Sequence, residues 1–422
     1  MTHDHDHDPA STSLLERQRA HLFFTWSAQR GAKGLEITDA AGARFEVAGK
    51  GWVWDLESQV YNVNAGHKHP HIQQRMIAQI QALPACAPAA VLPIRAELGE
   101  LLAQKTGMAK AFLTTGGSEA VENAIKLARL LTGRTKVITR RNSYHGATLA
   151  VLEVAGDMRK QPFTATMRPA LHIEDPYPAR QAAGEQPSDW LASAEAVIER
   201  EGGESIAAIL LEGFTGTNGM QHPPADFWPG VRALCDRHGI LLIDDEIFSG
   251  FGRTGRWFAR EHWGVRPDLM TVGKGLSSGY APLAGVLVSD ALAARFDDEV
   301  LWCGLTHYAH PISCAAAVGS IEVLEREGLP QNAERVGQVF ARRFDEFVER
   351  HAHVTGHRGL GLMRALELDR DASELSARAW SLGAYLPQRG PLAFVCPPLC
   401  LREHEAEAIC ELLDRALLEL GD

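Results

Sequence analysis

The segment "PDLMTVGKGLSSGYAPLAGVLVSD", residues 267–290, places a lysine between two glycines at the end of an apolar run. Residues 268–274 and 283–289 are short apolar, β-branched runs of the kind that form buried strands. Lys274 is therefore expected at a strand end inside a compact domain, where burial favours the uncharged amine. Such an amine can form a Schiff base with an aldehyde, whereas a solvated loop position is the common alternative for a lysine.

Three further strand-like runs lie upstream, at residues 136–140, 206–213 and 239–246. They alternate with periodic or loop segments, which predicts an α/β fold with parallel strands joined by crossovers and helices on both faces of the sheet. Ligands bind at the carboxyl ends of the strands in such folds. The last hundred or so residues contain charged amphipathic segments and indicate a smaller α+β domain.

Length and composition describe an ordinary globular protein. The chain has 422 residues, 45% hydrophobic and 23% charged, with a formal net charge of −11 and seven cysteines. This length predicts a large core and two domains. The acidic balance without a basic stripe argues against nucleic acid as a partner, and no apolar run is long enough to cross a membrane. The cysteines lack C-x-x-C spacing, which favours reduced thiols and a cytoplasmic location.

The N-terminal stretch "MTHDHDHDPASTS" alternates histidine and aspartate. Imidazole and carboxylate groups can both bind a transition metal, but a polar terminal tract is normally disordered. No matching ligand cluster is evident in the rest of the sequence, so we predict no metal site.

Polar residues follow two of the strand-like runs. Asp244, Asp245 and Glu246 end the run at 239–246, where a carboxylate could hold a protonated ring nitrogen, or simply cap a helix or form a salt bridge. Residues 112–130, "FLTTGGSEAVENAIKLARL", predict a strand, a Gly-Gly-Ser turn and a helix. The N–H groups at such a helix start suit a phosphate, although most such turns bind nothing.

Tyr144 and His145 follow the run at 136–140. An aromatic ring at this place could stack on a planar cofactor, while plain packing is the common alternative. The coincidence of lysine, carboxylate, anion turn and aromatic ring at strand ends is more informative than any one of them.

Five motifs, in order and spacing, resemble the signatures of class III pyridoxal-phosphate aminotransferases: "GGSEAVENAIKLAR", "SYHGAT", "LLIDDEIFSGFGRTG", "TVGKGLSSGYAPLAG" and "THYAHPISCAAA". The stretches "HLFFTWSAQ" and "SQVYNVNAGHKHP" are most similar to the branch of taurine:pyruvate and related ω-amino acid aminotransferases. The resemblance implies a fold-type I transferase, with a mainly parallel seven-stranded sheet in a large domain and a small α+β domain built from both ends of the chain.

The resemblance also implies roles for individual residues. Lys274 matches the lysine that holds pyridoxal 5'-phosphate as a Schiff base and then moves protons. Asp245 matches the carboxylate that pairs with the pyridine nitrogen, and Tyr144 and Ile247 match the residues on the two faces of the ring. In the family's reaction, hydrolysis releases a carbonyl product after the amine has reacted. A keto acid then reacts in the reverse direction, which gives ping-pong kinetics.

Three more positions match the phosphate site. Gly117 and Ser118 correspond to the phosphate-binding turn. Thr306 corresponds to the threonine that reaches the phosphate of the neighbouring subunit, which implies a homodimer with shared active sites, or a tetramer built from such dimers.

Two regions depart from the family pattern. Family members usually have Glu-Pro where this chain has Glu212 and Gly213, so Glu212 is expected beside the cofactor or paired with an arginine. The stretch that usually supplies the arginine for the substrate carboxylate is short, and Arg389 is our candidate, with a solvated loop arginine as the alternative.

The N-terminal aromatic residues Phe23, Phe24 and Trp26 are expected to fold over the active site. They could form a wall of the substrate pocket or anchor the segment on the core. We expect Phe24 and Trp26 to contact substrate.

The sequence therefore predicts an aminotransferase that moves an amino group from an ω-amino acid or related primary amine to pyruvate or 2-oxoglutarate. An aminomutase or racemase of the same fold, or a non-catalytic protein that binds pyridoxal phosphate, is the alternative. The expected organisation is a disordered tail (1–20), the N-terminal segment of the small domain (21–65), the large cofactor-binding domain (66–315) and the C-terminal small domain (316–422).

Overall fold

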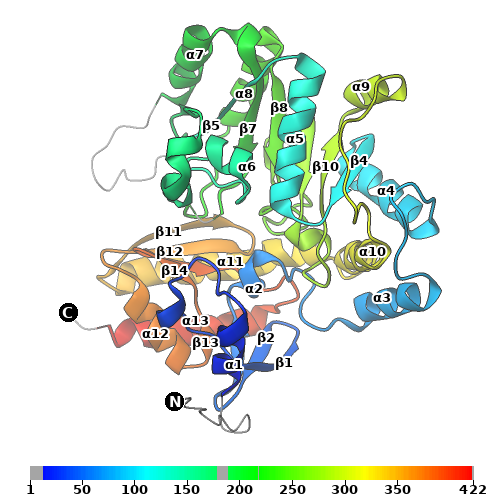
Figure 1. Ribbon diagram of the computed structural model, residues 1–422. Coiled ribbons are helices and arrows are strands. Elements are labelled where there is room, and N and C mark those ends of the chain that lie inside the picture. Colours follow the sequence, from blue (N-terminus) through cyan, green and yellow to red (C-terminus); the bar gives the residue numbers. More distant parts are fainter. Residues whose placement is uncertain (1–12, 178–188, 217, 421–422) are drawn as a thin grey trace, which may run out of the picture.

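The computed structural model describes residues 13–177, 189–216 and 218–420. The histidine- and aspartate-rich tract lies outside these residues, as does most of the expected tail. Figure 1 shows an upper part built around a large sheet and a lower part in which segments from both ends of the chain come together.

The large sheet contains seven strands in the order β4-β10-β9-β8-β7-β5-β6. Only β10 runs antiparallel to its two neighbours, and the pairs among β9, β8, β7, β5 and β6 are all parallel. This arrangement confirms the predicted α/β fold with a mainly parallel sheet. The strands are β4 (Lys110–Thr114), β5 (Lys136–Arg140), β6 (Leu171–Ile173), β7 (Ile206–Glu212), β8 (Leu241–Asp245), β9 (Leu269–Val272) and β10 (Ala284–Val288).

Helices cover both faces of this sheet (Figure 1). α5 (Gly117–Thr132) and α6 (Leu149–Val154) form a buried apolar cluster with one face, and α7 (Trp190–Glu201) and α8 (Phe227–His238) form another with the opposite face. Every residue of β7, β9 and β10 is buried, which explains their continuous apolar sequences. The short helix α9 (Asp290–Ala293) follows β10.

The lower part contains two four-stranded sheets, with the orders β1-β2-β3-β13 and β11-β12-β15-β14. In the first, β13 pairs in parallel with β3, so the two ends of the chain share one sheet. The strands are β1 (Ile37–Ala41), β2 (Arg44–Val47), β3 (Gly51–Asp55), β11 (Val354–Leu360), β12 (Met363–Leu368), β13 (Ala384–Tyr385), β14 (Gln388–Arg389) and β15 (Leu392–Val395).

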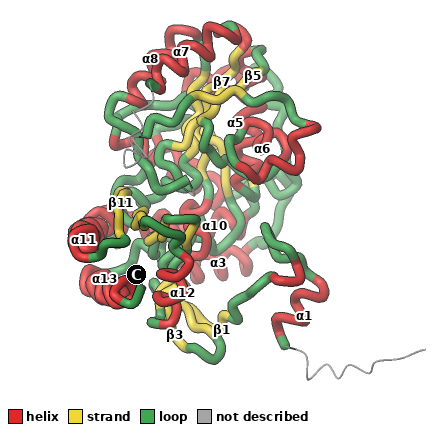
Figure 2. The backbone as a smooth tube through the Cα atoms, turned by 90° about the vertical axis from the view of Figure 1, so that its left-hand side faces the viewer, coloured by secondary structure: helices red, strands yellow, loops and turns green. Residues whose placement is uncertain are grey.

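Helix α10, which is almost wholly buried, packs on α3 and α4 beside the large sheet, and α11 packs against α13 below it. Figure 2 shows α1 standing to one side of the body. These helices are α1 (Leu14–His21), α2 (Ser58–Tyr61), α3 (Pro70–Ala82), α4 (Pro93–Thr106), α10 (Pro311–Arg326), α11 (Leu329–Arg350), α12 (Ser373–Ser381) and α13 (Glu403–Leu418). Short 3-10 helices cover Gln29–Gly31, Met158–Thr166, Gly203–Ser205, Ala259–His262, Lys274–Leu276 and Ala294–Asp297.

Two features differ from the expected organisation. Helix α1 begins at Leu14, inside the region expected to be a disordered tail, because Ser13 and Glu16 form a capping box. Helix α10 continues across the expected boundary at 315, and the domain boundaries as a set stay predictions. The seven cysteines are all free thiols. In the described ranges, no helix is both long enough and apolar enough to span a membrane.

Candidate active site

Lys274 follows the carboxyl end of β9, and the two glycines beside it are required by close contacts. A Cβ atom at Gly275 would lie 2.2 Å from Nδ2 of Asn64, and one at Gly273 would lie 3.3 Å from Cβ of Ala284. Lys274 itself has a φ of +46°, a strained value for a residue with a side chain. The backbone is thus held in one conformation that directs the lysine.

The Lys274 amine is placed in an apolar and anionic setting. Its Nζ lies 4.4 Å from the ring centroid of Phe248. Burial lowers the pKa of Lys274 to about 8, while the carboxylates of Asp245 and Glu212 oppose that decrease. Burial therefore favours the uncharged amine, as a nucleophile requires.

Asp245, the last residue of β8, is held by three hydrogen bonds. Its Oδ2 lies 2.7 Å from Nδ1 of His145, and its Oδ1 accepts from Oγ1 of Thr271 at 2.8 Å and from the backbone N of Ile247 at 3.2 Å. The carboxylate is 4% exposed. A buried carboxylate with this many donors is fixed in position at the end of the sheet.

The neighbouring acids point to the other side of β8, because side chains alternate along a strand. Glu246 accepts from the backbone N of Arg260 at 2.8 Å and from the Ser249 hydroxyl. Within the described part of the chain, neither carboxylate oxygen of Asp244 has a hydrogen-bond partner. Burial, and then the charge of Glu246, raises the pKa of Asp244 well above its usual value. Burial therefore favours the protonated form of Asp244.

The Gly-Gly-Ser turn leads into α5, as predicted. Gly116 precedes the helix without a side-chain cap, so the first N–H groups of α5 are open to an anion. The Ser118 hydroxyl accepts from the backbone N of Ala147 at 2.9 Å, and a Cβ atom at Gly117 would lie 3.1 Å from Cδ1 of Ile247. Ile247 also faces Gly273, so it connects the turn to the lysine segment.

One face of the Tyr144 ring is covered by a cation. The Cζ atom of Arg159 lies 3.7 Å from the Tyr144 ring centroid and 5.2 Å from that of Trp26. Nε and Nη2 of Arg159 donate to the two oxygens of the buried Asp157, at 2.7 and 2.9 Å. Burial favours the protonated form of Asp157, but the hydrogen bonds from Arg159 and the charge of Arg389 hold its pKa below the usual value.

Other predicted residues lie farther out. Phe23 is 90% exposed in the single chain. Phe24 packs within the N-terminal segment, because its ring lies beside Gly34 together with a methyl group of Leu15. Thr306 is exposed in the loop before α10. In the single chain, Arg159 lies over the rings of both Tyr144 and Trp26, and the charge of Arg389 acts on Asp157, whereas Phe23 and Thr306 are exposed.

Four residues of the site were not predicted to have a role in it from the sequence. His145 and Thr271 hydrogen-bond to Asp245. Arg140 pairs with Glu212, and Arg159 covers Tyr144. Thr271 lies opposite Asp245 in the β8–β9 register. Arg140 ends β5, beside β7, and this position at a strand end was a usable signal. No sequence signal pointed to Arg159, because it lies in a loop region with a 3-10 helix rather than at a strand end.

Comparisons with known proteins give the same family as the motifs. The model of the class-III aminotransferase family matches residues 27–417. Acetylornithine aminotransferase of Methanothermobacter thermautotrophicus is 33% identical, over 97% of this chain and 100% of its own length. Taurine–pyruvate aminotransferase of Rhodobacter capsulatus is 30% identical, over 92% of this chain and 91% of its own length.

A solved structure is also similar throughout. The taurine:2-oxoglutarate aminotransferase of Bifidobacterium kashiwanohense, in complex with PLP and glutamate, superposes with a TM-score of 0.90 at 30% identity, covering 95% of this chain and 96% of that one. This chain therefore belongs to the class III aminotransferases. It is a fold-type I enzyme that uses pyridoxal 5'-phosphate.

The residues present fit this cofactor. The uncapped start of α5 suits the phosphate, the lowered pKa of Lys274 suits a covalent link to the aldehyde, and the fixed carboxylate of Asp245 suits a protonated ring nitrogen. When bound, the cofactor supplies an electron-accepting ring. Among the described residues, no group of three or more His, Cys, Asp or Glu side chains could hold a metal ion.

Proposed function

We propose that this enzyme transfers the amino group of an ω-amino acid or related primary amine, such as taurine or β-alanine, to pyruvate or 2-oxoglutarate. The observation that carries this proposal is the group of cations beside Tyr144. Arg159 forms an ion pair with the carboxylate of Asp157, and the charge of Arg389 also acts on this carboxylate. An arginine fork suits a carboxylate or a sulfonate, so the arrangement favours a substrate with an acid group.

In this proposal, Lys274 binds the cofactor and moves the proton at the substrate carbon, and Asp245 keeps the ring nitrogen protonated. Gly117 and Ser118 hold the phosphate, and Tyr144 and Ile247 hold the ring. The uncharged Lys274 amine is suited to accept a proton, and Asp245 is suited to stabilise a positive charge on the ring.

Arg159, Arg389 and Trp26 would form the wall of the pocket for the substrate's acid group. Trp26 lies over Arg159 on the side of the N-terminal segment, so the segment can close the pocket as expected. Phe24 has the role of anchoring that segment within the chain. In this proposal the N-terminal segment contributes Trp26 to the pocket, rather than both Trp26 and Phe24.

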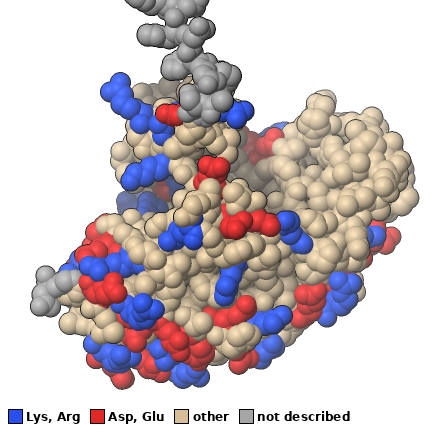
Figure 3. Space-filling model, turned by 90° about the horizontal axis from the view of Figure 1, so that it is seen from below, with Lys and Arg blue, Asp and Glu red and all other residues tan. Residues whose placement is uncertain are grey.

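A homodimer with shared sites is part of the proposal. Residues 70–94 contain only one charged residue, Arg75, and expose Ile77, Ile80, Leu83 and Val91. Figure 3 shows a broad area without charged side chains on its right, the side on which Figure 1 places α3 and α4. Such an exposed apolar face favours packing against a second copy of the chain. The exposed Thr306 would then be available to the phosphate bound by the partner subunit.

The test is a set of half-reactions followed by cofactor absorbance. Taurine, β-alanine and a simple alkylamine of the same length are each mixed with the enzyme, and pyruvate and 2-oxoglutarate are each mixed with the amine-loaded enzyme. We expect the two acid-bearing donors to react faster than the alkylamine. A faster reaction of the alkylamine would contradict the proposed substrate class without affecting the family.

A further inference from the structure

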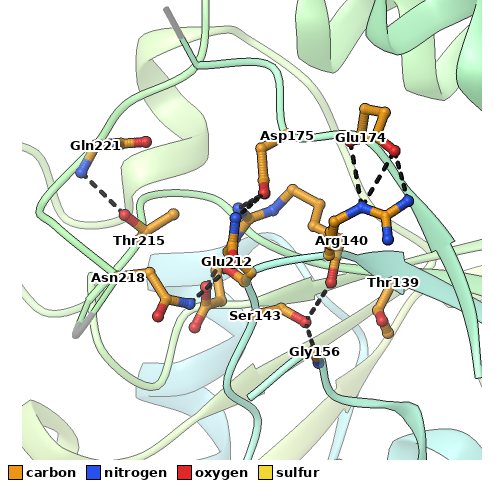
Figure 4. Close-up of polar contacts among 12 residues, drawn as sticks. Thr139, Arg140, Ser143, Gly156, Glu174, Asp175, Glu212, Thr215, Asn218 and Gln221 are labelled. Carbon is orange, nitrogen blue, oxygen red and sulfur yellow. Dashed lines mark hydrogen bonds and ion pairs between the residues drawn. The ribbon is translucent and has the colours of Figure 1, made fainter. Parts of the chain in front are cut away.

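Arg140, Asp175 and Glu212 form an ion-pair cluster around a buried guanidinium (Figure 4). Arg140, at the end of β5, has a fully buried side chain. Its Nη1 donates to Oδ1 of Asp175 at 2.9 Å, and its Nη2 donates to Oε2 of Glu212, at the end of β7, at 2.7 Å. One buried guanidinium therefore serves two carboxylates.

Glu212 also connects this cluster to the site. Its second oxygen, Oε1, accepts from the backbone N of Tyr144 at 3.3 Å, and the next residue, His145, binds Asp245. The loop between Arg140 and Tyr144 is fixed as well, because the Ser143 hydroxyl donates to the carbonyl of Arg140 at 2.9 Å. The position of Tyr144 thus depends on a carboxylate that Arg140 holds.

Glu212 is not arranged as a movable group. Its side chain is 7% exposed, and Arg140 is 0% exposed with one nitrogen, Nε, already lacking a hydrogen-bond partner within the described residues. If Glu212 moved away to pair with a substrate-binding arginine, it would leave part of a buried guanidinium unpaired, which is costly. Glu212 is therefore fixed in position.

Glu212 lies opposite Asp245 in the β7–β8 register, and Asp245 lies opposite Thr271, three residues before Lys274, in the β8–β9 register. The charges on these neighbouring strand ends affect the pKa values of Glu212 and Lys274. Burial raises the pKa of Glu212, Arg140 and then His145 oppose that rise, and Asp245 adds to it. Around Lys274, the negative charges of Asp245 and Glu212 favour the protonated amine, while the positive charges of Arg253 and Arg159 disfavour it. The ring of Tyr177, 5.1 Å from Cζ of Arg140, closes the far side of the cluster.

We propose that Arg140 is a positioning residue that keeps Glu212 ionised at the same sheet edge as Lys274, so that the pair sets the proton affinity of the nitrogen of Lys274. Arg140 does not contact Lys274 and acts through Glu212. Without Arg140, burial would make Glu212 take up a proton and lose its charge, because no other cation hydrogen-bonds to Glu212 among the described residues. The nitrogen of Lys274 would then lose a proton at lower pH.

The experiment is a pH titration of the visible absorbance of the cofactor linked to Lys274, in Arg140→Gln, Glu212→Gln and the double variant. We expect both single variants to lower the pKa of the linkage by about one unit. The double variant should match Glu212→Gln, because both changes remove the same charge. The matched control is Arg141→Gln, which removes the exposed ion pair of the next residue with Glu174 and should leave the pKa unchanged.

The sign of the shift decides the outcome. Arg140→Gln would raise the pKa if Arg140 acted only through its own positive charge, and a rise would overturn the proposal. Additive shifts in the double variant, or no shift in Glu212→Gln, would also overturn it. If Arg140→Gln does not fold, the Glu212→Gln result and the pH dependence of covalent labelling of Lys274 in cofactor-free protein still decide the question, since both report the charge of Glu212.

Discussion

The imidazole Nδ1 of His145 lies 2.7 Å from Oδ2 of Asp245, and both side chains are buried. Thr271 occupies the other carboxylate oxygen, so Asp245 is restrained on both sides. Its sequence neighbour Asp244, in contrast, has no hydrogen-bond partner within the described residues and a raised pKa. The two adjacent aspartates thus differ in their hydrogen bonding, and substitution should affect them very differently.

Asp245→Asn should reduce turnover by roughly 10³-fold, because the ring nitrogen loses the charge that keeps it protonated. Cofactor binding should weaken much less, since the phosphate contacts remain. Asp244→Asn is the control, and it should leave turnover nearly unchanged because an amide closely resembles the neutral acid that it replaces. Steady-state kinetics and cofactor titration measure both effects. Equal damage from the two substitutions would contradict the assignment.

Borohydride reduction of the enzyme should attach the cofactor to Lys274. Mass spectrometry of the digested protein would then find the adduct on the peptide that contains this residue. Lys274→Ala should retain bound cofactor but lose nearly all turnover, because the ring and phosphate contacts remain while the proton-transferring amine is gone. An adduct on a different lysine would be incompatible with the proposed site.

The lowered pKa of Lys274 predicts a pH dependence of stability in cofactor-free protein. The folded value is about 8 and the usual value is 10.5, so between these pH values the unfolded chain binds more protons than the folded chain. The free energy of unfolding should therefore rise with pH across this window, by an amount on the order of 3 kcal/mol. Below pH 8 the destabilisation is fully present. Denaturant unfolding of wild type and Lys274→Met should show that the pH-dependent difference disappears in the variant.

Arg389→Ala should weaken the reaction with keto-acid acceptors by about 10-fold to 100-fold and spare a simple amine donor. The exposed position of Arg389 and its effect on Asp157 place it at the edge of the cation group. Arg159→Ala should cause a larger loss, since Arg159 also covers Tyr144. Half-reaction rates separate donor from acceptor effects. No loss of acceptor use in either variant would assign the acid group to another part of the protein.

Val91→Glu should dissociate the proposed dimer. Val91 is 95% exposed in the single chain and lies in the segment with one charged residue, where a buried carboxylate would be costly. Analytical ultracentrifugation would show a monomer, with weaker cofactor binding if Thr306 completes the partner's phosphate site. Val300→Glu makes the same substitution at another exposed valine. It reports whether the loop before α10 belongs to the same interface. A wild-type monomer in solution would refute the shared site.

Much of the fold could be predicted because burial leaves a clear record in sequence. The strands β7, β8 and β9 are apolar runs, and Asp245 and Lys274 stand at the ends of two of them. The antiparallel direction of β10 was not predicted, although the short connection between β9 and β10 favours it, since a parallel crossover needs a dozen or more residues.

The contacts between distant residues were beyond the sequence analysis. Arg140 meets Glu212 only because β5 lies beside β7, an order that local patterns do not specify. Arg159 reaches Tyr144 through a loop whose path depends on tertiary packing. The sequence could therefore predict which residue types stand at the sheet edge, but not which of them neutralise each other.

The pairing of β13 with β3 also has a consequence for synthesis of the chain. Trp54 and Asp55 lie opposite Ala384 and Tyr385 in that pair. During translation, the first sheet must keep the edge of β3 open until more than three hundred further residues have left the ribosome. An open strand edge is a site of unwanted association. Nascent chains that stall before β13 should therefore be the aggregation-prone and chaperone-bound species of this protein.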